Sequence, residues 1–195
     1  MNKYPIYAEV KGRKYKINTD FRYALECNKI ALDDNIGDLE RALAIIYILY
    51  GDKGLENVDD YNSLLNIAQK YLSCGKELKN KDEKPDMDFI EDYSYIKTSF
   101  RSDYGIKLDE EEIHWWEFMD LMNGLSNSEI GDCCILNRIR NLRNLDTKDI
   151  QDNKEKQKIE EAKREVELKC NKKKITEKEK ESATKILEQI RIGKE

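Results

Sequence analysis

The side chains best suited to chemistry lie together in the second half of the chain. The segment 113–125, I-H-W-W-E-F-M-D-L-M-N-G-L, contains the only histidine and both tryptophans. A nucleophilic triad requires a histidine base, an orienting acid and an activated nucleophile, and the spacing around His114 assembles no such set. We therefore expect His114 to be an exposed or hydrogen-bonded helix residue without a catalytic role.

Two other groups of residues could serve a metal or redox site. The carboxylates D-E-E-E at 109–112 could hold a cation, but we expect a helix to begin there, and the helix dipole favours acidic residues in the first turn. The five cysteines form no C-x-x-C pair and lack the spacing of a zinc site, so we expect them to be small buried residues in a reducing cytosol. No glycine-rich phosphate-binding motif is present. The sequence thus predicts neither an enzyme nor a bound metal or cofactor.

The composition bears on two classes of partner. Hydrophobic residues make up 39% of the 195 residues and charged residues 38%, and the net charge is −5. Residues 147–195 contain 15 Lys and Arg against 12 Asp and Glu, so residues 1–146 carry a net charge of −8. Nucleic-acid binding requires clustered positive charge, and a membrane span requires about 20 apolar residues, whereas the longest apolar run covers only 42–50. We expect neither nucleic acid nor a membrane as a partner.

Hydrophobic periodicity predicts a mostly α-helical protein. Alternating residues at 4–17, interrupted by Lys11-Gly12, indicate a small N-terminal β-hairpin with a tight turn. Apolar residues at helical spacing then recur to the end of the chain. The expected helices cover 20–30, 38–50, 59–72, 87–104, 109–124 and 126–145, and a helical tail begins at 146 or 147. We expect a compact multi-helix domain over 1–146 and a charged helical extension over 147–195.

The expected helix around His114 presents a wide apolar arc. Four of its large side chains fall on one side at helical spacing, and Trp116 lies about 100° from Trp115. Two interpretations remain open: the arc is entirely core, or one tryptophan and the adaptable methionines form a surface that binds another helix. The candidate partner-binding residues of this segment are Trp115, Trp116, Phe118, Met119 and Met122.

The extension carries a second, narrower apolar stripe. Thr176-x-x-Glu179 can cap a last helix, on which Ala183 and three larger residues follow at helical spacing. A stripe this narrow cannot hold a domain alone. It either docks on the body of its own chain or binds another chain, which could be a second copy or a partner helix. The candidate partner-binding residues here are Ile186, Leu187 and Ile190.

Several short motifs in order along the chain resemble one protein family. They are I-N-T-D-F-R at 17–22, Y-I-x-x-x-F at 95–100, Y-G-I-x-L at 104–108 and H-W-W-x-F at 114–118, followed by Gly124-Leu125. The sequence is similar in these motifs to the bacteriophage gene-product-fifteen family over about residues 6–145. Those proteins are encoded in the tail-assembly gene cluster of phages and prophages of Gram-positive bacteria.

The resemblance implies an α-helical protein of phage tail morphogenesis that acts in the host bacterial cytoplasm. It implies a tail assembly chaperone that binds the tape-measure protein, with the tail tube protein as a further partner, and no catalytic residues. The alternatives are a structural tail component that stays in the virion, and a phage protein that binds a host factor such as an immune-system component. The charged extension is longer than the resemblance leads us to expect.

Overall fold

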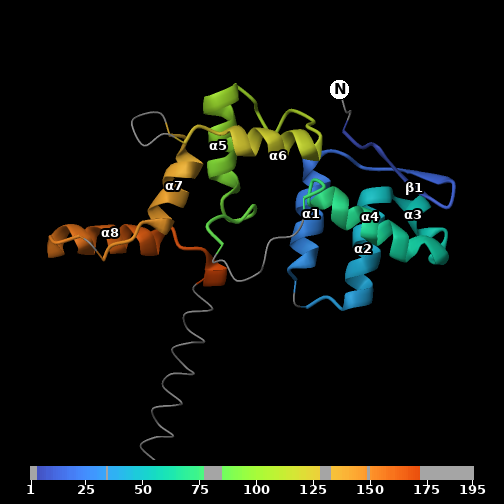
Figure 1. Ribbon diagram of the computed structural model, residues 1–195, viewed down its shortest axis with the longest axis horizontal. Helices are drawn as coiled ribbons and strands as arrows, with labels where there is room; N and C mark the ends of the chain where they lie inside the picture. Colours follow the sequence, from blue (N-terminus) through green and yellow to red (C-terminus); the bar gives the residue numbers. More distant parts are fainter. Residues whose placement is uncertain (1–3, 34, 77–84, 128–132, 149, 172–195) are drawn as a thin grey trace, which may run out of the picture.

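The structure is a computed structural model that describes residues 4–33, 35–76, 85–127, 133–148 and 150–171. It confirms a mostly α-helical protein with a small N-terminal antiparallel hairpin. The elements in chain order are β1 (Tyr7–Val10), β2 (Arg13–Lys16), α1 (Phe21–Ala31), α2 (Asp38–Tyr50), α3 (Asp52–Leu55), the 3-10 helix η1 (Val58–Asp60), α4 (Tyr61–Leu72), α5 (Tyr93–Tyr104), α6 (Trp115–Gly124), α7 (Ile135–Asn144) and α8 (Asn153–Glu165). Figure 1 shows the hairpin and α1–α4 at one end, α5 and α6 in the middle, and α7 and α8 at the other end.

The hairpin forms where the sequence predicts it. Lys11 and Gly12 have φ angles of 50° and 79°, and a two-residue turn with both φ angles positive matches the twist of the paired strands. Ala8 pairs with Tyr15, and both side chains are buried. Ile6, which belongs to the same alternating pattern, is 52% exposed.

A buried carboxylate ties the hairpin to the start of α4. Asp60 is fully buried, and its two oxygens accept hydrogen bonds from Arg13 Nε at 2.7 Å, Arg13 Nη2 at 2.6 Å and the Tyr15 hydroxyl at 2.6 Å. The guanidinium of Arg13, and then the hydroxyl of Tyr15, lower the pKa of Asp60 to about 2. The charged form of Asp60 is therefore the one that the folded protein stabilises.

Stability should consequently fall in acid through Asp60. An aspartate in an unfolded chain titrates near 3.9, above the folded value of about 2. The contribution of Asp60 is therefore complete above about pH 4–5 and is lost as the pH falls toward 2. We expect Asp60→Asn to unfold at lower urea concentration at pH 7 and to show a weaker dependence of the urea midpoint on pH between 5 and 3. Asp59→Asn is the control, because the Asp59 side chain is exposed; an equal effect of both variants would contradict this role of Asp60.

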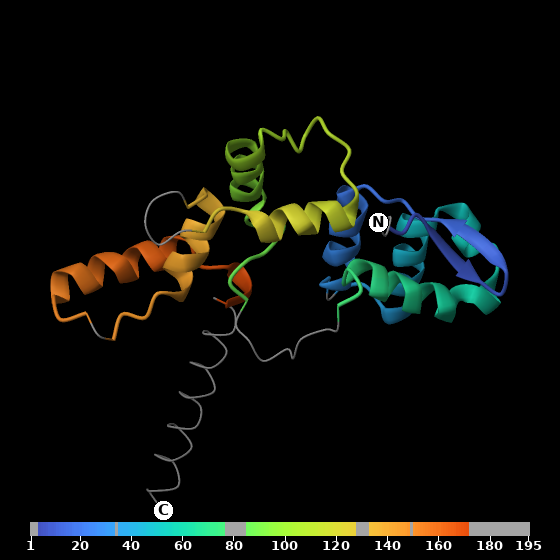
Figure 2. The same ribbon diagram turned by 45° about the horizontal axis from the view of Figure 1, so that its top comes forward.

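The first four helices surround a shared core beside the hairpin. Asp20 caps α1 by accepting a hydrogen bond from the backbone N–H of Arg22 at 3.0 Å, as its side-chain chemistry favours. Figure 2 shows the hairpin alongside α3 and α4. The buried apolar side chains of this part are Ala8, Val10, Tyr15, Ile17, Phe21, Ala24, Cys27, Ile46, Leu49, Tyr50, Leu64, Ala68 and Tyr71.

The expected starts of α5 and α6 are wrong. Residues 87 and 88 are irregular and residues 89–92 form a turn before α5, because Asp88 accepts hydrogen bonds from the backbone N–H groups of Ile90 and Glu91, each at 2.8 Å. The acidic run at 109–112 does not open α6 either. The backbones on both sides of His114 instead bond to residues 19–21, which keeps this segment extended up to the first residue of α6.

The expected starts of α7 and α8 are also wrong. The backbone N–H of Ser126 donates to Asp103 at 2.8 Å, and Ser126 and its neighbour Asn127 are not helical. The helix toward Leu145 begins at Ile135. In the extension, α8 starts after Asp152, whose side chain accepts from Lys154 N and Glu155 N, and not after residue 146 or 147.

The described part of the extension returns to the body after α8. Figures 1 and 2 both show α8 reaching outward past the end of α7. No residue of α8 is buried, whereas Leu168, which follows it, is 1% exposed. Asn171 Nδ2 then donates to the carbonyl of Pro85 at 3.1 Å. The buried contacts of the described extension therefore lie in the turn at 166–171, after the end of α8.

Candidate functional site

The candidate partner-binding residues of α6 divide into two groups. Trp115, Phe118 and Met122 are 2%, 0% and 8% exposed. Trp116 and Met119 are half-buried and pack against the core from outside. Ile186, Leu187 and Ile190 lie outside the described residues. Of the five candidates on this helix, Trp116 and Met119 are the two that leave apolar surface accessible to a partner.

The buried side of α6 forms an aromatic stack. Phe118 lies parallel to Phe21, with ring centroids 4.6 Å apart and an interplanar angle of 2°. Its ring also stacks on Phe100 at 5.1 Å and on Trp115 at 5.7 Å. Such ring pairs stabilise a fold beyond the area that they bury. These rings join α1, α5 and α6, so their role is structural.

The two adjacent tryptophans both cap the end of α4. The last carbonyl groups of a helix have no partner within it. Trp115 Nε1 donates to the carbonyl of Leu72 at 3.1 Å, and Trp116 Nε1 donates to the carbonyl of Tyr71 at 2.9 Å. The Trp116 ring also packs against the rings of Tyr71 and Tyr4, at 6.3 and 6.4 Å. The W-W pair therefore fixes where α4 ends against α6.

His114 is hydrogen-bonded, as expected, but it precedes the helix instead of lying within it. Its Nδ1 accepts a hydrogen bond from the backbone N–H of Trp116 at 3.0 Å, which makes it the N-cap of α6. The proton therefore resides on Nε2, which lies 3.0 Å from the carbonyl of Pro5 and donates to it. The ring also stacks on Tyr4 at 4.9 Å. Both ring nitrogens thus serve to join the N-terminal segment to α6.

The capping role of His114 predicts a graded response to substitution. His114→Ala should lower the free energy of unfolding by about 1–2 kcal/mol, because the N-cap acceptor and the contact with Tyr4 are lost. His114→Asn should lose less, because an asparagine oxygen can accept the same backbone hydrogen bond. Urea unfolding followed by circular dichroism measures the difference. Equal losses in the two variants would show that the cap contributes nothing.

The motif I-N-T-D-F-R lies against the segment that leads into α6. Phe21 N donates to the carbonyl of Ile113 at 2.9 Å, and Trp115 N donates to the carbonyl of Thr19 at 2.7 Å. Arg22 Nη2 donates to the carbonyls of Leu108 and Glu111, at 2.6 and 3.0 Å. The motifs that are distant in sequence are therefore joined in the fold, and their hydrogen bonds serve its architecture.

The other residues whose side chains could take part in chemistry also have structural roles. Lys97 pairs with Asp109 at 2.7 Å, and Lys107 pairs with Glu110 at 3.0 Å. Burial raises the pKa of Cys27 to about 12 and that of Cys74 to about 11, whereas reactive thiols have lowered pKa values. The described residues include no group of three or more His, Cys, Asp and Glu placed to bind a metal ion. None of the helices that the structure describes is both long enough and apolar enough to cross a membrane.

A largely exposed apolar surface, which the sequence analysis did not identify, lies on the first two helices. We define the α2 stripe as Leu39, Leu43 and Tyr47, which follow one another at a spacing of four. Leu39 is 71% exposed and Tyr47 52% exposed, and Leu43 between them is half-buried. Leu32, at the end of α1, is 72% exposed. Although α2 contains the longest apolar run of the sequence, one of its sides has no cover from the described residues.

The connection between α1 and α2 is held firmly beside this surface. Arg41 donates hydrogen bonds to the carbonyls of Ile30, Asp33 and Ile36, at 3.3, 2.8 and 2.9 Å. These bonds fix the loop that carries Leu32 and leads into α2. The exposed apolar side chains therefore stand on a well-supported scaffold.

An apolar cavity of about 430 Å³ lies between α1, α2 and α4, and we call it the α1–α4 groove. Its polar side chains are confined to Asn28, Gln69 and Ser73. Two described cavities differ from it in lining. One, of about 610 Å³, includes Asp103 and Arg138, and the other, of about 250 Å³, includes Arg143 and Glu160. The apolar residues of the α1–α4 groove are Ala31, Ile45, Leu65, Ala68 and Leu72.

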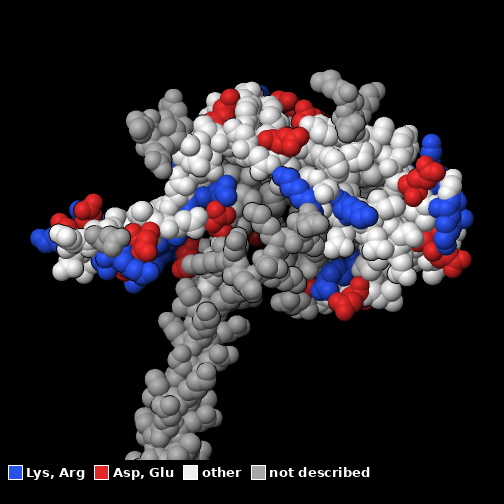
Figure 3. Space-filling model, in the orientation of Figure 1, with Lys and Arg blue, Asp and Glu red and all other residues white. Residues whose placement is uncertain are grey.

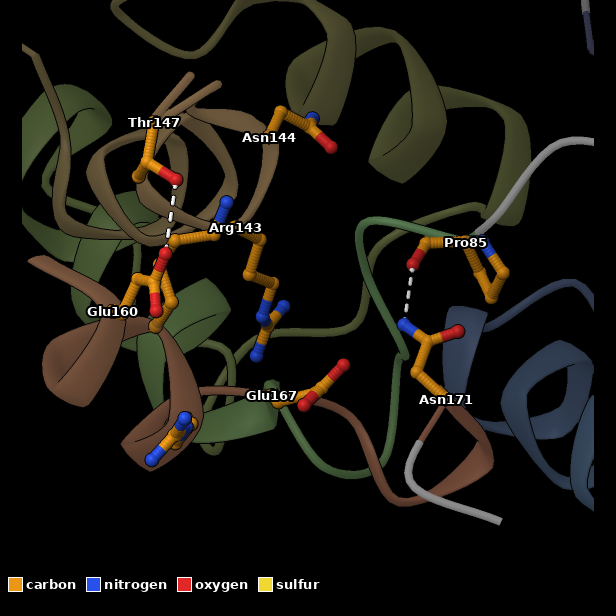
Figure 4. Close-up of a pocket in the computed structure, with 9 residues that line it drawn as sticks. Pro85, Arg143, Asn144, Thr147, Glu160, Glu167 and Asn171 are labelled. Atoms are coloured by element: carbon orange, nitrogen blue, oxygen red, sulfur yellow. Dashed lines mark hydrogen bonds between the residues drawn. The ribbon is translucent and has the colours of Figure 1, made fainter. Parts of the chain in front are cut away.

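Figure 4 shows the polar cavity where α7, α8 and Pro85 meet. Thr147 donates to Glu160 at 3.2 Å across one side. Arg143 lies in its wall, but four of its hydrogen bonds go to protein acceptors, including both oxygens of Asp92 at 2.7 Å. Figure 3 shows Lys and Arg side chains interspersed with Asp and Glu over one face of the molecule.

These observations define a mostly α-helical protein whose recognisable motifs hold its helices together and whose exposed apolar surface lies on α2. The match of the bacteriophage Gp15 protein family model over residues 1–168 shows that the chain belongs to this bacteriophage family. The match includes the first part of the charged extension and ends at the turn that contains Leu168. A comparison with the curated proteins gave no match, and a comparison with the solved structures gave none either.

Proposed function

We propose that the protein is a tail assembly chaperone that binds the phage tape-measure protein without covalent chemistry, in the host cytoplasm. The observation that supports this proposal most directly is the uncovered α2 stripe on a rigid pair of helices. Large exposed apolar side chains that stand together are typical of a protein-binding surface. A spacing of four along α2 matches the spacing with which a partner helix presents its own apolar residues.

The charge of this part of the chain supports an apolar mode of binding. Residues 1–76 contain 11 Lys and Arg and 11 Asp and Glu, so the segment that carries the α2 stripe has no net charge. Attraction between the net charges of two partners is screened by salt, whereas burial of apolar area is not. We therefore expect affinity for an apolar helix of the tape-measure protein to change little between low and physiological salt.

The size of the surface suits a reversible complex. A chaperone must release its client when the tail tube forms around it, and very large apolar interfaces belong to permanent complexes. The α2 stripe with Leu32 offers only a few large side chains. Such a patch can shield part of a client helix and still exchange.

The test replaces the exposed ends of the α2 stripe. The double variant Leu39→Glu, Tyr47→Glu should bind purified tape-measure protein at least about tenfold more weakly, because two carboxylates would lose their water at the interface. Its urea midpoint should stay close to that of the wild type, since both side chains are exposed. Ile90→Glu is the control, because Ile90 is 55% exposed and lies outside the stripe. Unchanged binding by the double variant would reject the α2 stripe as the client surface.

Purified phage particles provide an independent test of the role. A chaperone leaves before the tail is complete, so mass spectrometry of particles should detect no stoichiometric amount of this protein. If the protein is present at the copy number of a tail component, it is a structural protein of the virion and not a chaperone. A pull-down from uninfected host lysate that retains one host protein through the α2 stripe would favour the host-factor alternative.

A further inference from the structure

The strand β2 directs half of its backbone groups away from its partner strand. In an antiparallel pair, successive residues point their N–H and C=O groups alternately toward the partner strand and away from it. Ile17 N donates to the carbonyl of Ile6 at 3.0 Å, and Lys16 and Lys14 lie one and three residues before Ile17. The N–H and C=O groups of these two lysines therefore point away from β1. We call these four backbone groups the β2 edge.

The described residues leave the β2 edge open. The backbone groups of Lys14 and Lys16 form no hydrogen bond with any of them, and both residues are exposed. β1 has α4 as a close neighbour, whereas no described helix packs closely along β2. Figures 1 and 2 both show the hairpin at the outer end of the molecule. A row of unpaired backbone groups of this kind can pair with an extended chain, which then forms a further strand.

The rest of the hairpin holds the β2 edge in a fixed position. Tyr15, between the two lysines, is 2% exposed, and its hydroxyl donates to the buried carboxylate of Asp60 at 2.6 Å. The chain after β2 is also anchored, because Asn18 N donates to the carbonyl of Leu49 in α2 at 2.8 Å. A strand that is already ordered loses little conformational freedom when another strand pairs with it.

The side chains beside the β2 edge select the charge of an added strand. Lys14 and Lys16 project to the solvent side of the hairpin, because Tyr15 between them is buried. Neither lysine has an ion-pair partner among the described residues, although Glu9 of β1 lies opposite Lys14. An added strand would place its own side chains about 5 Å from those of the lysines, where opposite charges stabilise the pairing and like charges weaken it.

The same charges disfavour a second copy of this chain as the added strand. If two β2 strands paired across a two-fold axis at Tyr15, Lys14 of each copy would lie opposite Lys16 of the other. Like charges directly opposite one another destabilise a sheet, and lysines on exposed edges protect sheets against such pairing. An acidic strand from another protein meets no such repulsion. Its acidic residues must stand two positions apart, because successive side chains alternate between the two faces.

We propose that the β2 edge binds an extended acidic segment of another protein, which adds to the hairpin as a third strand. The added strand is antiparallel to β2, the pairing that is more stable per residue. Two acidic residues of the segment lie opposite Lys14 and Lys16, and the residue between them lies beside Tyr15. The site goes beyond the proposed chaperone function and uses none of the residues of the α2 stripe, so each proposal can fail without the other.

Amide exchange measured by NMR on the full chain tests this pairing. The probe is a blocked peptide of alternating glutamate and valine, used at saturating concentration and at low salt, where charge attraction is screened least. The amides of Lys14 and Lys16 should exchange with water several-fold more slowly when the peptide is bound. The amides of Tyr7 and Glu9, which point away from β2, should keep their rates. Slower exchange of Tyr7 and Glu9 instead, or unchanged rates throughout, would overturn the proposal.

Methylated peptides separate backbone pairing from charge attraction. In the antiparallel pairing, the backbone nitrogens of the two glutamates face β2, and those of the valines face away from it. Methyl groups on the glutamate nitrogens should therefore abolish the protection of Lys14 and Lys16, and methyl groups on the valine nitrogens should not. Protection by the peptide with methylated glutamates would overturn the proposal, because charge attraction alone would then explain the binding.

A charge exchange tests the role of the two lysines. The variant Lys14→Glu, Lys16→Glu should lose protection by the glutamate peptide and gain it from the same peptide with lysine in place of glutamate. Its urea midpoint should stay close to that of the wild type, since both side chains are exposed. The control Lys53→Glu, Lys70→Glu makes the same change in net charge at exposed positions outside the hairpin and should keep the wild-type preference. The same preference in the hairpin variant and the wild type, or protection that appears without peptide as the protein concentration rises, would overturn the proposal.

Discussion

Replacing Trp115 by alanine is expected to lower the free energy of unfolding by about 3–5 kcal/mol, the range found for large aromatic residues in cores. The Trp115 side chain is 2% exposed and stacks on Phe118 with ring centroids 5.7 Å apart. The substitution leaves a cavity between α4 and α6, and it also removes the hydrogen bond to the carbonyl of Leu72. Urea unfolding at pH 7, followed by far-UV circular dichroism, measures the loss.

The neighbouring tryptophan provides the matched comparison. Trp116 is half-buried, so Trp116→Ala should lose only about 1–2 kcal/mol, from partial burial and from the hydrogen bond to Tyr71. Both variants remove one indole from the same turn of α6. Equal losses would contradict the division of this helix into a core side and a surface side.

Replacing Arg143 by alanine should lower the free energy of unfolding by a similar amount, about 3–5 kcal/mol. The side chains of Arg143 and Asp92 are 8% and 1% exposed, and two hydrogen bonds of 2.7 Å join them. Without Arg143, the carboxylate of Asp92 would remain buried without its cation. The substitution also frees the carbonyl of Val166, to which Arg143 Nε donates at 2.6 Å. The turn at 166–171 should therefore loosen together with the start of α5.

A second arginine on α7 is the control for Arg143. Arg140 pairs with Asp86 at 3.0 Å, but both side chains are about one third exposed, at 36% and 30%. Exposed ion pairs contribute little, so Arg140→Ala should cost no more than about 1 kcal/mol. The double variant Asp92→Leu, Arg143→Met should recover much of the loss, because apolar residues can replace a buried pair without leaving a charge behind. If the double variant recovers no stability, the hydrogen bonds from Arg143 to backbone carbonyls account for most of its contribution.

Features that depend on neighbouring residues were predictable from the sequence. The turn at Lys11-Gly12 and the end of α5 at Gly105, which has a φ angle of 73°, follow from local backbone preferences. The cap of α1 at Asp20 is equally local. These features require only a few residues of sequence, and the structure has them at the expected positions.

Features that depend on distant partners were not predictable in the same way. The acidic run at 109–112 has the pattern of a helix start, yet hydrogen bonds between residues 19–21 and the flanks of His114 determine where α6 begins. The turn before α5 includes Asp92, whose cation stands 51 positions further along the chain. These distant contacts, and not the local sequence patterns, determine where the helices begin, because each contact satisfies buried backbone or charged groups.

The candidate site shows the same division. Helical spacing identified the apolar arc of α6, but only packing reveals that Trp115 is core and that Trp116 is partly accessible. The α2 stripe was missed because α2 is apolar on most of its sides. A helix of that kind gives no sequence signal for which side its neighbours leave uncovered.

The bond between His114 and Pro5 has a consequence for biosynthesis. These residues are 109 positions apart, so the amino end cannot settle on its final neighbours until more than half of the polypeptide has left the ribosome. Closing so long a loop costs entropy before any contact rewards it. During translation, the apolar residues of α1 and α4 therefore remain exposed until the aromatic residues of α6 have been synthesised. The nascent chain is most prone to aggregate in this interval.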